Sequence, residues 1–469
     1  MKINGLMIDC SRLIERHEYY HRLVDFMADW GMNTLVLHFS DDYGCAVELP
    51  GFEELAMPHA FSSSEIRALI DHARKRKVTI IPELETFGHT RFITDHPRYR
   101  HLFAGRKTGR LRFNAIDPLA DETHSLIRRL IRATCAVFPG CFIHLGCDEV
   151  DLTDYCRERG LDPAETWASY VNAVIGYARD VGRTPLIWAD HLVHDDKIRR
   201  LVRKDVIAIH WRYTADVNDE PIRQLKQTGF ERIWVAPSLA CYGYRFLPTV
   251  IALENTNRMV SFASRHGLEG VLNTIWCPFR YLQNALYYGI AYSALAVAEG
   301  QPLQTEDFHR EFARRVLGLP LSPALNEFLG GWTGLTIRSP AAIKIMKRST
   351  ALWSAEELAE MRRMNATGRR VLAAAQSVRP EANCEIWQGM VLAAQCAWLC
   401  TEWVLLRHSK SRNEKRKAAF NRMLRSVRKK LVEEWDRTRY PDDPQKNRAK
   451  FPGTAHQYAV LLMRRVTFV

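Results

Sequence analysis

The sequence predicts an α/β fold: a (β/α)8 TIM barrel followed by an α-helical C-terminal domain. Eight short apolar or β-branched runs recur through the first 300 of the 469 residues, and amphipathic helical stretches separate them. No G-x-G-x-x-G motif follows the first run, which favours a closed barrel over an open doubly wound sheet. After about Gly300 the strand pattern stops. We therefore assign residues 1–300 to the barrel and 301–469 to the helical domain.

The expected strands pair in parallel because a helix-length segment separates each from the next. The strands are expected at Ile3–Ile8, Thr34–His38, Val78–Pro82, Cys141–Gly146, Thr184–Trp188, Val206–His210, Arg232–Ala236 and Gly270–Trp276. The helices are expected at Tyr19–Trp30, Ser64–Arg76, Asp121–Val137, Ala164–Val181 and Gln283–Ala298. The C-terminal helices are expected at Asp307–Leu317, Ser322–Trp332, Ala355–Ser377, Cys384–Leu406 and Asn413–Trp435.

Composition narrows the class of protein. The apolar share of 47% is ordinary for a globular chain, and no run approaches the roughly 20 continuous apolar residues of a membrane span. The N-terminus has no basic region followed by a long apolar stretch, so we expect a cytoplasmic protein without a membrane partner. The 11 cysteines are scattered, and no C-x-x-C pair occurs. Reduced thiols are therefore expected, with neither a disulfide framework nor a structural zinc site.

The net charge of +13 is concentrated in one segment. Residues 407–430 contain eleven Lys or Arg and one Glu, so most of the excess lies there. The same segment has an apolar face at helical spacing, formed by Phe420, Leu424, Val427 and Leu431. A helix with one packed face and one solvated basic face is the simplest interpretation. No nucleic-acid module accompanies it, so no nucleic-acid partner is expected, and an anionic partner stays open for this helix alone.

Chemistry in a barrel is expected at the carboxyl ends of the strands, because the βα loops build that face. Every expected strand ends in carboxylates, histidines or aromatic residues, which together are typical of a sugar site. In strand order these are Asp9; His38, Asp41 and Asp42; Glu83, Glu85 and His89; Asp148 and Glu149; Trp188 and Asp190; His210 and Trp211; Tyr242 and Tyr244; and Trp276.

Each residue also has a structural explanation. Asp9 could cap the first helix, and His144 lies inside an apolar strand as a core histidine would. The tryptophans could pack at the end of the barrel, and adjacent acids suit a helix N-terminus. A coincidence at all eight strand ends is harder to explain structurally, so we interpret the set as functional.

Two segments resemble a known family. The run Phe142–Val150, FIHLGCDEV, resembles the H-x-G-x-D-E signature of glycoside hydrolase family 20, the β-hexosaminidases. The run Ile81–His89, IPELETFGH, is similar to that family's I-P-E-x-x-x-x-G-H segment. The resemblance covers roughly residues 3–300 and is closest to the hexosaminidase D-like branch. The segments similar to this branch are Ser63–Ile66, Thr86–His89, His144–Val150, Pro185–Trp188 and Trp211–Asp216.

The resemblance implies an exo-acting β-N-acetylhexosaminidase that retains anomeric configuration through attack by the substrate's own 2-acetamido oxygen. Glu149 would be the general acid and base, and Asp148 would hold the acetamido N–H. Asp42 and His89 would form a relay to Glu149. Tyr242 would donate to the acetamido oxygen, with Tyr244 as second choice. The walls of the sugar site would come from Trp188, Trp211 and Trp276, with Asp9, Glu85 and His144 as further substrate-binding residues.

The resemblance also implies a metal-independent reaction with no cofactor. The partner would be a carbohydrate with a terminal N-acetylhexosamine, and a homodimer is possible. Two positions depart from the family pattern. Asn4 stands where many members have an arginine, and Pro278 where an acid often follows the last tryptophan; both family residues address outer sugar hydroxyls. The choice between GlcNAc and GalNAc is therefore open; the resemblance to the hexosaminidase D-like branch implies tolerance for, or preference toward, galactosamine substrates.

Two other functions stay open. Histidines and carboxylates at strand ends also suit a metal-dependent barrel hydrolase. Its ligands would come from His38, Asp41, His89, His191, His194 or Asp148. A non-catalytic sugar-binding protein is the third interpretation, although a pure binding site gains little from the Asp148-Glu149 pair. Chelator sensitivity would mark the metal-dependent hydrolase, and binding without turnover would mark the binding protein.

Overall fold

A computed structural model describes residues 1–105, 115–240, 249–278, 281–335, 353–409 and 414–440. The chain divides into two compact units. The barrel unit comprises Met1–Ser238, Asn255–Ile275 and Ala296–Gln301. The helical unit comprises Leu239–Glu254, Trp276–Leu295 and Pro302–Val469.

The predicted (β/α)8 barrel is confirmed. Its parallel strands follow the order β1-β2-β6-β7-β8-β9-β10-β12, and β1 pairs with β12 to close the ring. The strands are β1 (Ile3–Asp9), β2 (Thr34–His38), β6 (Thr79–Glu83), β7 (Phe142–His144), β8 (Thr184–Trp188), β9 (Ile207–Trp211), β10 (Ile233–Ala236) and β12 (Gly270–Ile275). A short strand, β11 (Ser238–Ala240), belongs to the same sheet.

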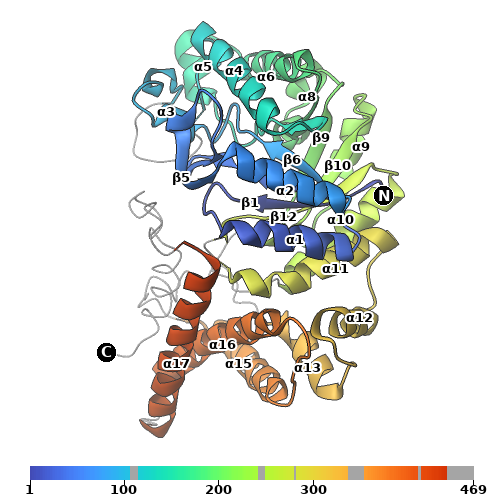
Figure 1. Ribbon diagram of the computed structural model, residues 1–469, viewed down its shortest axis with the longest axis vertical. Helices are drawn as coiled ribbons and strands as arrows, with labels where there is room; N and C mark the ends of the chain where they lie inside the picture. The colour runs from blue at the N-terminus through green and yellow to red at the C-terminus, as the bar shows by residue number, and fades with distance from the viewer. Residues whose placement is uncertain (106–114, 241–248, 279–280, 336–352, 410–413, 441–469) are drawn as a thin grey trace. The chain divides into compact units, whose positions relative to one another are not determined.

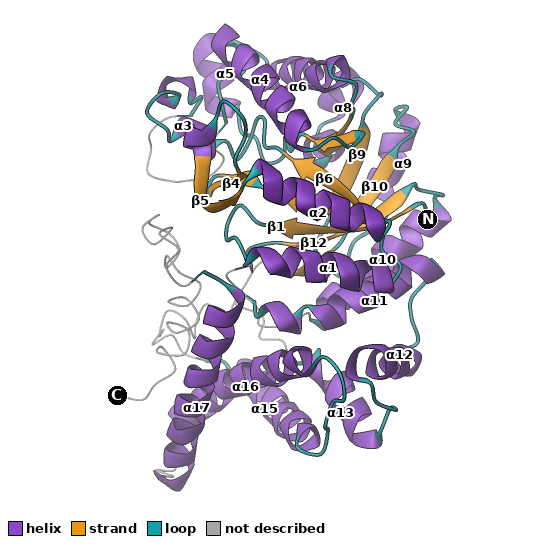
Figure 2. Ribbon diagram, viewed as in Figure 1, coloured by secondary structure: helices purple, strands orange, loops and turns teal. Residues whose placement is uncertain are grey.

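Helices surround the strands, as Figure 2 shows. They begin where the sequence supplies a cap: Ser62 forms a capping box with Glu65, and Asp162 caps a later long helix just before Pro163. Their apolar stripes face the barrel, and α1 and α2 lie side by side over the strands (Figure 1). The long helices of the barrel unit are α1 (His17–Asp29), α2 (Ser63–Lys75), α4 (Asp121–Val137), α6 (Pro163–Asp180) and α10 (Val250–Arg265). The short ones are α3 (Arg91–Thr94), α5 (Thr153–Arg159), α7 (Asp190–His194), α8 (Asp196–Leu201) and α9 (Glu220–Gln227). Helix α11 (Tyr287–Glu299) lies mostly in the helical unit.

Two details differ from the predicted elements. The strand expected over Cys141–Gly146 ends at His144, because Gly146 and Cys147 adopt left-handed backbone conformations that a strand cannot contain. The loop after β2 also forms a small sheet that the sequence did not suggest: β3 (Ser40–Asp41), β4 (Gly44–Val47) and β5 (Ala56–Phe61). These strands are too short and irregular to show a clear alternation of apolar and polar residues in the sequence. The small sheet nevertheless fixes Ser40 and Asp41, which follow β2 directly.

The elements described after residue 302 are helices, as predicted (Figure 2). The helices are α12 (Thr305–Leu317), α13 (Pro323–Trp332), α15 (Ala355–Ala375), α16 (Cys384–Arg407) and α17 (Glu414–Thr438). α16 packs against both α15 and α17. By length and apolar composition α16 would also suit a membrane span, but 78% of its most apolar stretch is buried in the structure. That burial is typical of the central helix of a helical domain.

Candidate active site

The site is built from the carboxyl ends of β1, β2, β6 and β7 and the loops that follow them. Parallel strands in a closed barrel bring these ends to one rim, so residues distant in sequence meet there. Asp148 and Glu149 follow β7, and His89 follows β6 after a turn at Gly88. Only glycine fits at position 88, because a Cβ there would overlap the carbonyl oxygen of Asp148. The two loops therefore approach at van der Waals distance.

His89 lies between two pairs of carboxylates. Its Nδ1 is 3.4 Å from Asp42 Oδ2 and 3.6 Å from Asp41 Oδ2. Its Nε2 is 3.4 Å from Glu149 Oε2 and 3.8 Å from Asp148 Oδ2. Burial alone would lower the pKa of His89, but hydrogen bonds to Asp42 and Glu149 raise it well above the usual value. The structure thus places three of the predicted catalytic residues, Asp42, Asp148 and Glu149, around the imidazolium of a fourth, His89.

The two adjacent acids occupy different environments. The hydrogen bond from His89 lowers the pKa of Glu149, whose side chain is 30% exposed. Burial, with repulsion from Asp190 and Glu149, raises the pKa of Asp148 to about 7, although His89 opposes the shift. In the free protein the proton therefore resides on Asp148 rather than Glu149. Two neighbouring acids whose pKa values are shifted in opposite directions are typical of sites for general acid–base chemistry.

A second charged layer lies beneath this pair, inside the barrel. His38 Nδ1 is 3.2 Å from Glu83 Oε2, and its Nε2 is 3.3 Å from Asp41 Oδ2. Burial by itself would lower the pKa of His38, but the charge of Glu83 and both hydrogen bonds raise it to about 10. Burial would conversely raise the pKa of Glu83, but the charges of His38 and His144 lower it to about 2. His38 and Glu83 therefore form a buried ion pair.

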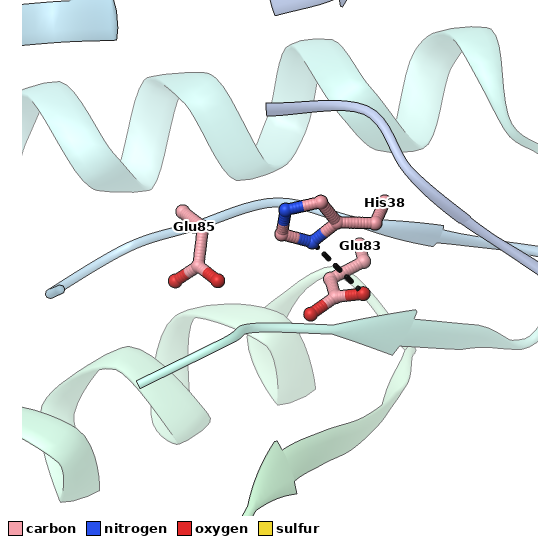
Figure 3. A group of neighbouring side chains, drawn as sticks. All are labelled: His38, Glu83 and Glu85. Atoms are coloured by element: carbon pink, nitrogen blue, oxygen red, sulfur yellow. Dashed lines mark ion pairs between the residues drawn. The ribbon is translucent and has the colours of Figure 1, made fainter. Parts of the chain in front are cut away.

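Glu85 lies beside this pair without joining it (Figure 3). Both of its carboxyl oxygens are buried and have no hydrogen-bond partner among the described residues. Burial, followed by repulsion from Asp148, raises the pKa of Glu85 well above its usual value. Its carboxyl packs on Gly146, where a Cβ would overlap Oε2. Glu85 is thus a neutral acid packed under the Asp148 loop.

Two triads have the geometry to hold a metal ion: His38, Glu83 and Glu85, and Asp41, Asp42 and His89. The ligand atoms of each triad lie within 4.8 Å of one another. Both ring nitrogens of His38, and both of His89, face carboxylates, and the pKa of each ring is raised. A protonated imidazole has no lone pair for a metal. Between these carboxylates each imidazole is held protonated, so the described cluster is a set of ion pairs.

Other predicted residues occupy different positions. Asp9 is buried and accepts from Ser11 and from the backbone and guanidinium of Arg12. Trp188 is fully buried, donates from Nε1 to Glu83 Oε1 at 2.6 Å, and packs on His144 at a centroid distance of 4.5 Å. Trp188 and His144 thus lie in the inner layer with Glu83.

The remaining aromatic residues are less closely tied to this cluster. Trp211 is half-buried and stacks with Tyr213 at 5.0 Å. Trp276 is buried in the helical unit, where its backbone N–H donates to Ala240. Tyr242 and Tyr244 lie outside the described residues. The roles assigned to all of them stay predictions.

The structure adds Arg12, which sequence reasoning did not select, and gives Asp190 and His191 a role that was not predicted for them. Arg12 donates to Asp9 Oδ2 at 2.8 Å and to Asp41 Oδ2 at 2.7 Å, so it joins the ends of β1 and β2. Burial alone would raise the pKa of Asp41, but Arg12 and the two histidines lower it. Asp190 and His191, at the start of α7, bind the backbone of the Asp148-Glu149 loop. Asp190 was named in the sequence as a strand-end residue and His191 as a ligand of the metal-dependent alternative, whereas Arg12 was not singled out.

The structure also locates Asn4 and Pro278, the two residues that depart from the family pattern. Asn4 is buried at the amino end of β1 and binds Asn33 and Gly31. It therefore lies at the opposite end of its strand from Asp9. Pro278 belongs to the helical unit, and its carbonyl accepts from Arg439 at 3.1 Å.

Comparison with known proteins is consistent with this geometry. Residues 2–247 match the family model "Glycosyl hydrolase family 20, catalytic domain". The human beta-hexosaminidase subunit beta is 26% identical over 262 residues, which cover 51% of this chain and 46% of that protein. Hexosaminidase D of Bos taurus is 27% identical over 223 residues, which cover 44% of this chain and 62% of that protein. The chain thus spans about half to three fifths of the length of these relatives.

Solved structures share the fold. A beta-N-acetylhexosaminidase from Bacteroides fragilis has a TM-score of 0.55 at 18% identity, covering 67% of this chain and 69% of that one. A GH20 exo beta-N-acetylglucosaminidase from Vibrio harveyi has a TM-score of 0.52 at 22% identity, covering 63% of this chain and 54% of that one.

Proposed function

The chain belongs to glycosyl hydrolase family 20, and we propose that it is an exo-acting β-N-acetylhexosaminidase for terminal β-linked GalNAc or GlcNAc. The observation that carries this proposal is the adjacent Asp148-Glu149 pair, with Glu149 ion-paired to His89. The curated relatives named beta-hexosaminidase and Hexosaminidase D support the same activity.

The proposed reaction needs no enzymatic nucleophile. The acetamido oxygen of the substrate attacks C1 while the bond from C1 to the aglycone breaks, and Glu149 gives its proton to the leaving oxygen. Asp148 accepts the acetamido N–H and stabilises the positive charge of the oxazolinium intermediate. Glu149 then takes a proton from water as the water oxygen attacks C1, which restores the acetamide and retains configuration at C1.

The proposed reaction requires a different distribution of protons between Asp148 and Glu149 from that of the free protein. The reaction needs the proton on Glu149 and a negative charge on Asp148, whereas the free protein favours the reverse. An acetamido N–H bound to Asp148 favours its ionised form and so moves the shared proton toward Glu149. Activity then requires one proton on the pair. The rate falls above about pH 7, where that proton is lost, and in acid, where a second proton binds.

The direct test compares three chromogenic substrates: the 4-nitrophenyl β-glycosides of N-acetylgalactosamine, N-acetylglucosamine and glucose. We expect nitrophenol release from the first two, unaffected by a chelator, with a bell-shaped pH dependence. The glucoside is the matched control, because it lacks the acetamido group and should not react. The ratio of the first two rates measures the preference of this chain for GalNAc or GlcNAc. Asn4 and Pro278 stand at the two positions where the chain departs from the family pattern. Chelator-sensitive release would favour the metal-dependent hydrolase, and N-acetylhexosamine binding without turnover would favour the binding protein.

We also propose a cytoplasmic location. Ten cysteines in the described residues are free thiols, among them the exposed Cys141 and Cys384, and this suits a reducing compartment. Labelling of unreduced protein taken from its native compartment tests this, and protection of these two thiols from a maleimide would contradict it. A homodimer stays a prediction that light scattering can check.

A further inference from the structure

The loop that carries Asp148 and Glu149 has an unusual backbone. β7 contains only three residues, and the chain then turns through positive φ angles at Gly146 (66°), Cys147 (73°) and Glu149 (51°). Residues with a Cβ disfavour this region because the Cβ crowds the backbone carbonyl oxygen. Such a conformation persists only where surrounding contacts hold it.

Two side chains at the start of α7 supply those contacts. The backbone N–H of Glu149 donates to Asp190 Oδ2 at 3.0 Å. The next N–H, that of Val150, donates to His191 Nε2 at 3.0 Å. Consecutive backbone groups are thus bound by consecutive side chains, 41 residues along the chain. On the β6 side, Gly88 lies against the carbonyl of Asp148.

We propose that Asp190 and His191 are positioning residues of this active site, which hold the loop so that Asp148 and Glu149 address two atoms of one sugar. This inference rests on the proposed function. Neither residue needs to touch the substrate. Rotation of the Glu149 backbone would move its carboxyl away from His89, and a displacement of about 1 Å at a catalytic group can reduce the rate about 100-fold.

The two residues need defined protonation states. His191 Nε2 accepts a hydrogen bond, so the ring is neutral and carries its proton on Nδ1. Burial keeps the pKa of His191 below the usual value, as does the nearby His194, while Asp190, Asp195 and Glu149 oppose the shift. Trp167 packs on the ring at 4.9 Å. Protonation of His191 at Nε2 would place an N–H donor against the backbone N–H of Val150. The hydrogen bond between them would then break.

Asp190 has a second, electrostatic effect. Its charge is among the causes that raise the pKa of Asp148, after burial. An asparagine at position 190 keeps an oxygen that can accept from Glu149 but removes the charge. The pair of variants Asp190→Ala and Asp190→Asn therefore separates the hydrogen bond from the charge.

Steady-state kinetics of the full chain across pH, with a 4-nitrophenyl N-acetylhexosaminide, test both effects. For Asp190→Ala we expect kcat to fall about 100-fold with little change in KM. For Asp190→Asn we expect a smaller loss, about tenfold, and an alkaline limb displaced downward by about 0.5 to 1 pH unit. The surface variant Asp71→Asn, on α2, is the control and should match wild type. Wild-type kinetics in both variants, or equal losses with an unmoved limb, would overturn the proposal.

A second measurement does not depend on turnover. His191→Phe keeps an aromatic ring against Trp167 but removes the acceptor. We expect the amide hydrogen of Val150 to exchange about tenfold faster in this variant, and that of Glu149 in Asp190→Ala. The ¹⁵N spectrum of wild type should show His191 neutral with unprotonated Nε2 at pH 7. Unchanged exchange in both variants would refute the positioning role. If wild type hydrolyses none of the substrates, the proposed function fails, while these two measurements still decide whether Asp190 and His191 hold the loop.

Discussion

Two buried acids at the candidate active site differ in their hydrogen bonding from the buried acids of the helical unit. In the barrel unit, Glu85 has no hydrogen-bond partner among the described residues for either carboxyl oxygen, and Oδ1 of Asp148 has none either. Both carboxyls have raised pKa values because they are buried, Glu85 with further repulsion from Asp148 and Asp148 from neighbouring acids. Desolvation and repulsion between neighbouring acids thus keep protons bound at this end of the barrel.

The helical unit provides its buried acids Glu402 and Glu434 with partners. Glu402, on α16, accepts from Arg416 at 2.5 and 2.8 Å and from Asn365 at 2.9 Å. Burial would raise the pKa of Glu402, but Arg416 lowers it. Glu434, on α17, accepts from Asn284 at 2.8 Å and from Arg437 at 2.5 Å.

The contrast separates structural charges from functional ones. A buried carboxylate without a partner reduces stability, so it persists where its chemistry is needed. A buried carboxylate with several donors can be explained by packing alone. Three substitutions test this distinction, and their expected effects decrease from Glu149→Gln through Arg416→Gln to Asp148→Asn.

Glu149→Gln should nearly abolish hydrolysis. The amide cannot give or take the proton that the proposed reaction needs, and we expect kcat to fall about 10³-fold. Stability should fall only modestly. The lowered pKa of Glu149 means that its charge beside His89 favours the folded state, but Asp41, Asp42 and Asp148 remain near the imidazolium after the change. Kinetics with the nitrophenyl substrates and a thermal melt check both points, with the exposed Glu122→Gln as control. Wild-type turnover in Glu149→Gln would contradict the assignment.

Arg416→Gln should do the opposite. It leaves Glu402 buried without its bidentate partner, and we expect the free energy of unfolding to fall by about 3 kcal/mol. The rate per folded molecule should not change. Urea denaturation of the full chain measures the loss. The double variant Arg416→Gln/Glu402→Gln should recover most of it, because no unpaired charge then remains. If the double variant is no more stable than the single one, lost packing rather than an unpaired charge causes the destabilisation.

Asp148→Asn should stabilise the protein while it reduces activity. The pKa of Asp148 is raised from 3.8 to about 7, so the folded state binds this proton more tightly than the unfolded state does. The resulting stabilisation is complete below pH 3.8 and is lost as pH rises through about 7. The asparagine variant should therefore gain on wild type by on the order of 1 kcal/mol between pH 5 and pH 8. Denaturation at both pH values, with Asp71→Asn as control, measures the gain; a difference between variant and wild type that does not depend on pH would contradict it.

Much of the fold follows from local sequence. Strand β2 and the helices that were predicted agree with their expected spans within a few residues, because alternation and helical periodicity are properties of neighbouring residues; α10 was not among the predicted helices. The placement of Asp148 and Glu149 at a strand end also follows from sequence, since an apolar run stops just before them. The family motif then supplies their expected roles.

The partners of these residues depend on the tertiary structure. Arg12 meets Asp41 across 29 positions, and Glu149 meets Asp190 across 41. No periodicity encodes such pairs, because barrel closure decides which strand ends become neighbours. The early end of β7 likewise depends on contacts from Gly88, Asp190 and His191 that hold its left-handed loop. The sequence alone determined which groups the barrel rim carries; the fold decided which of them share a proton, because proton sharing depends on distances of a few ångströms between separate strands.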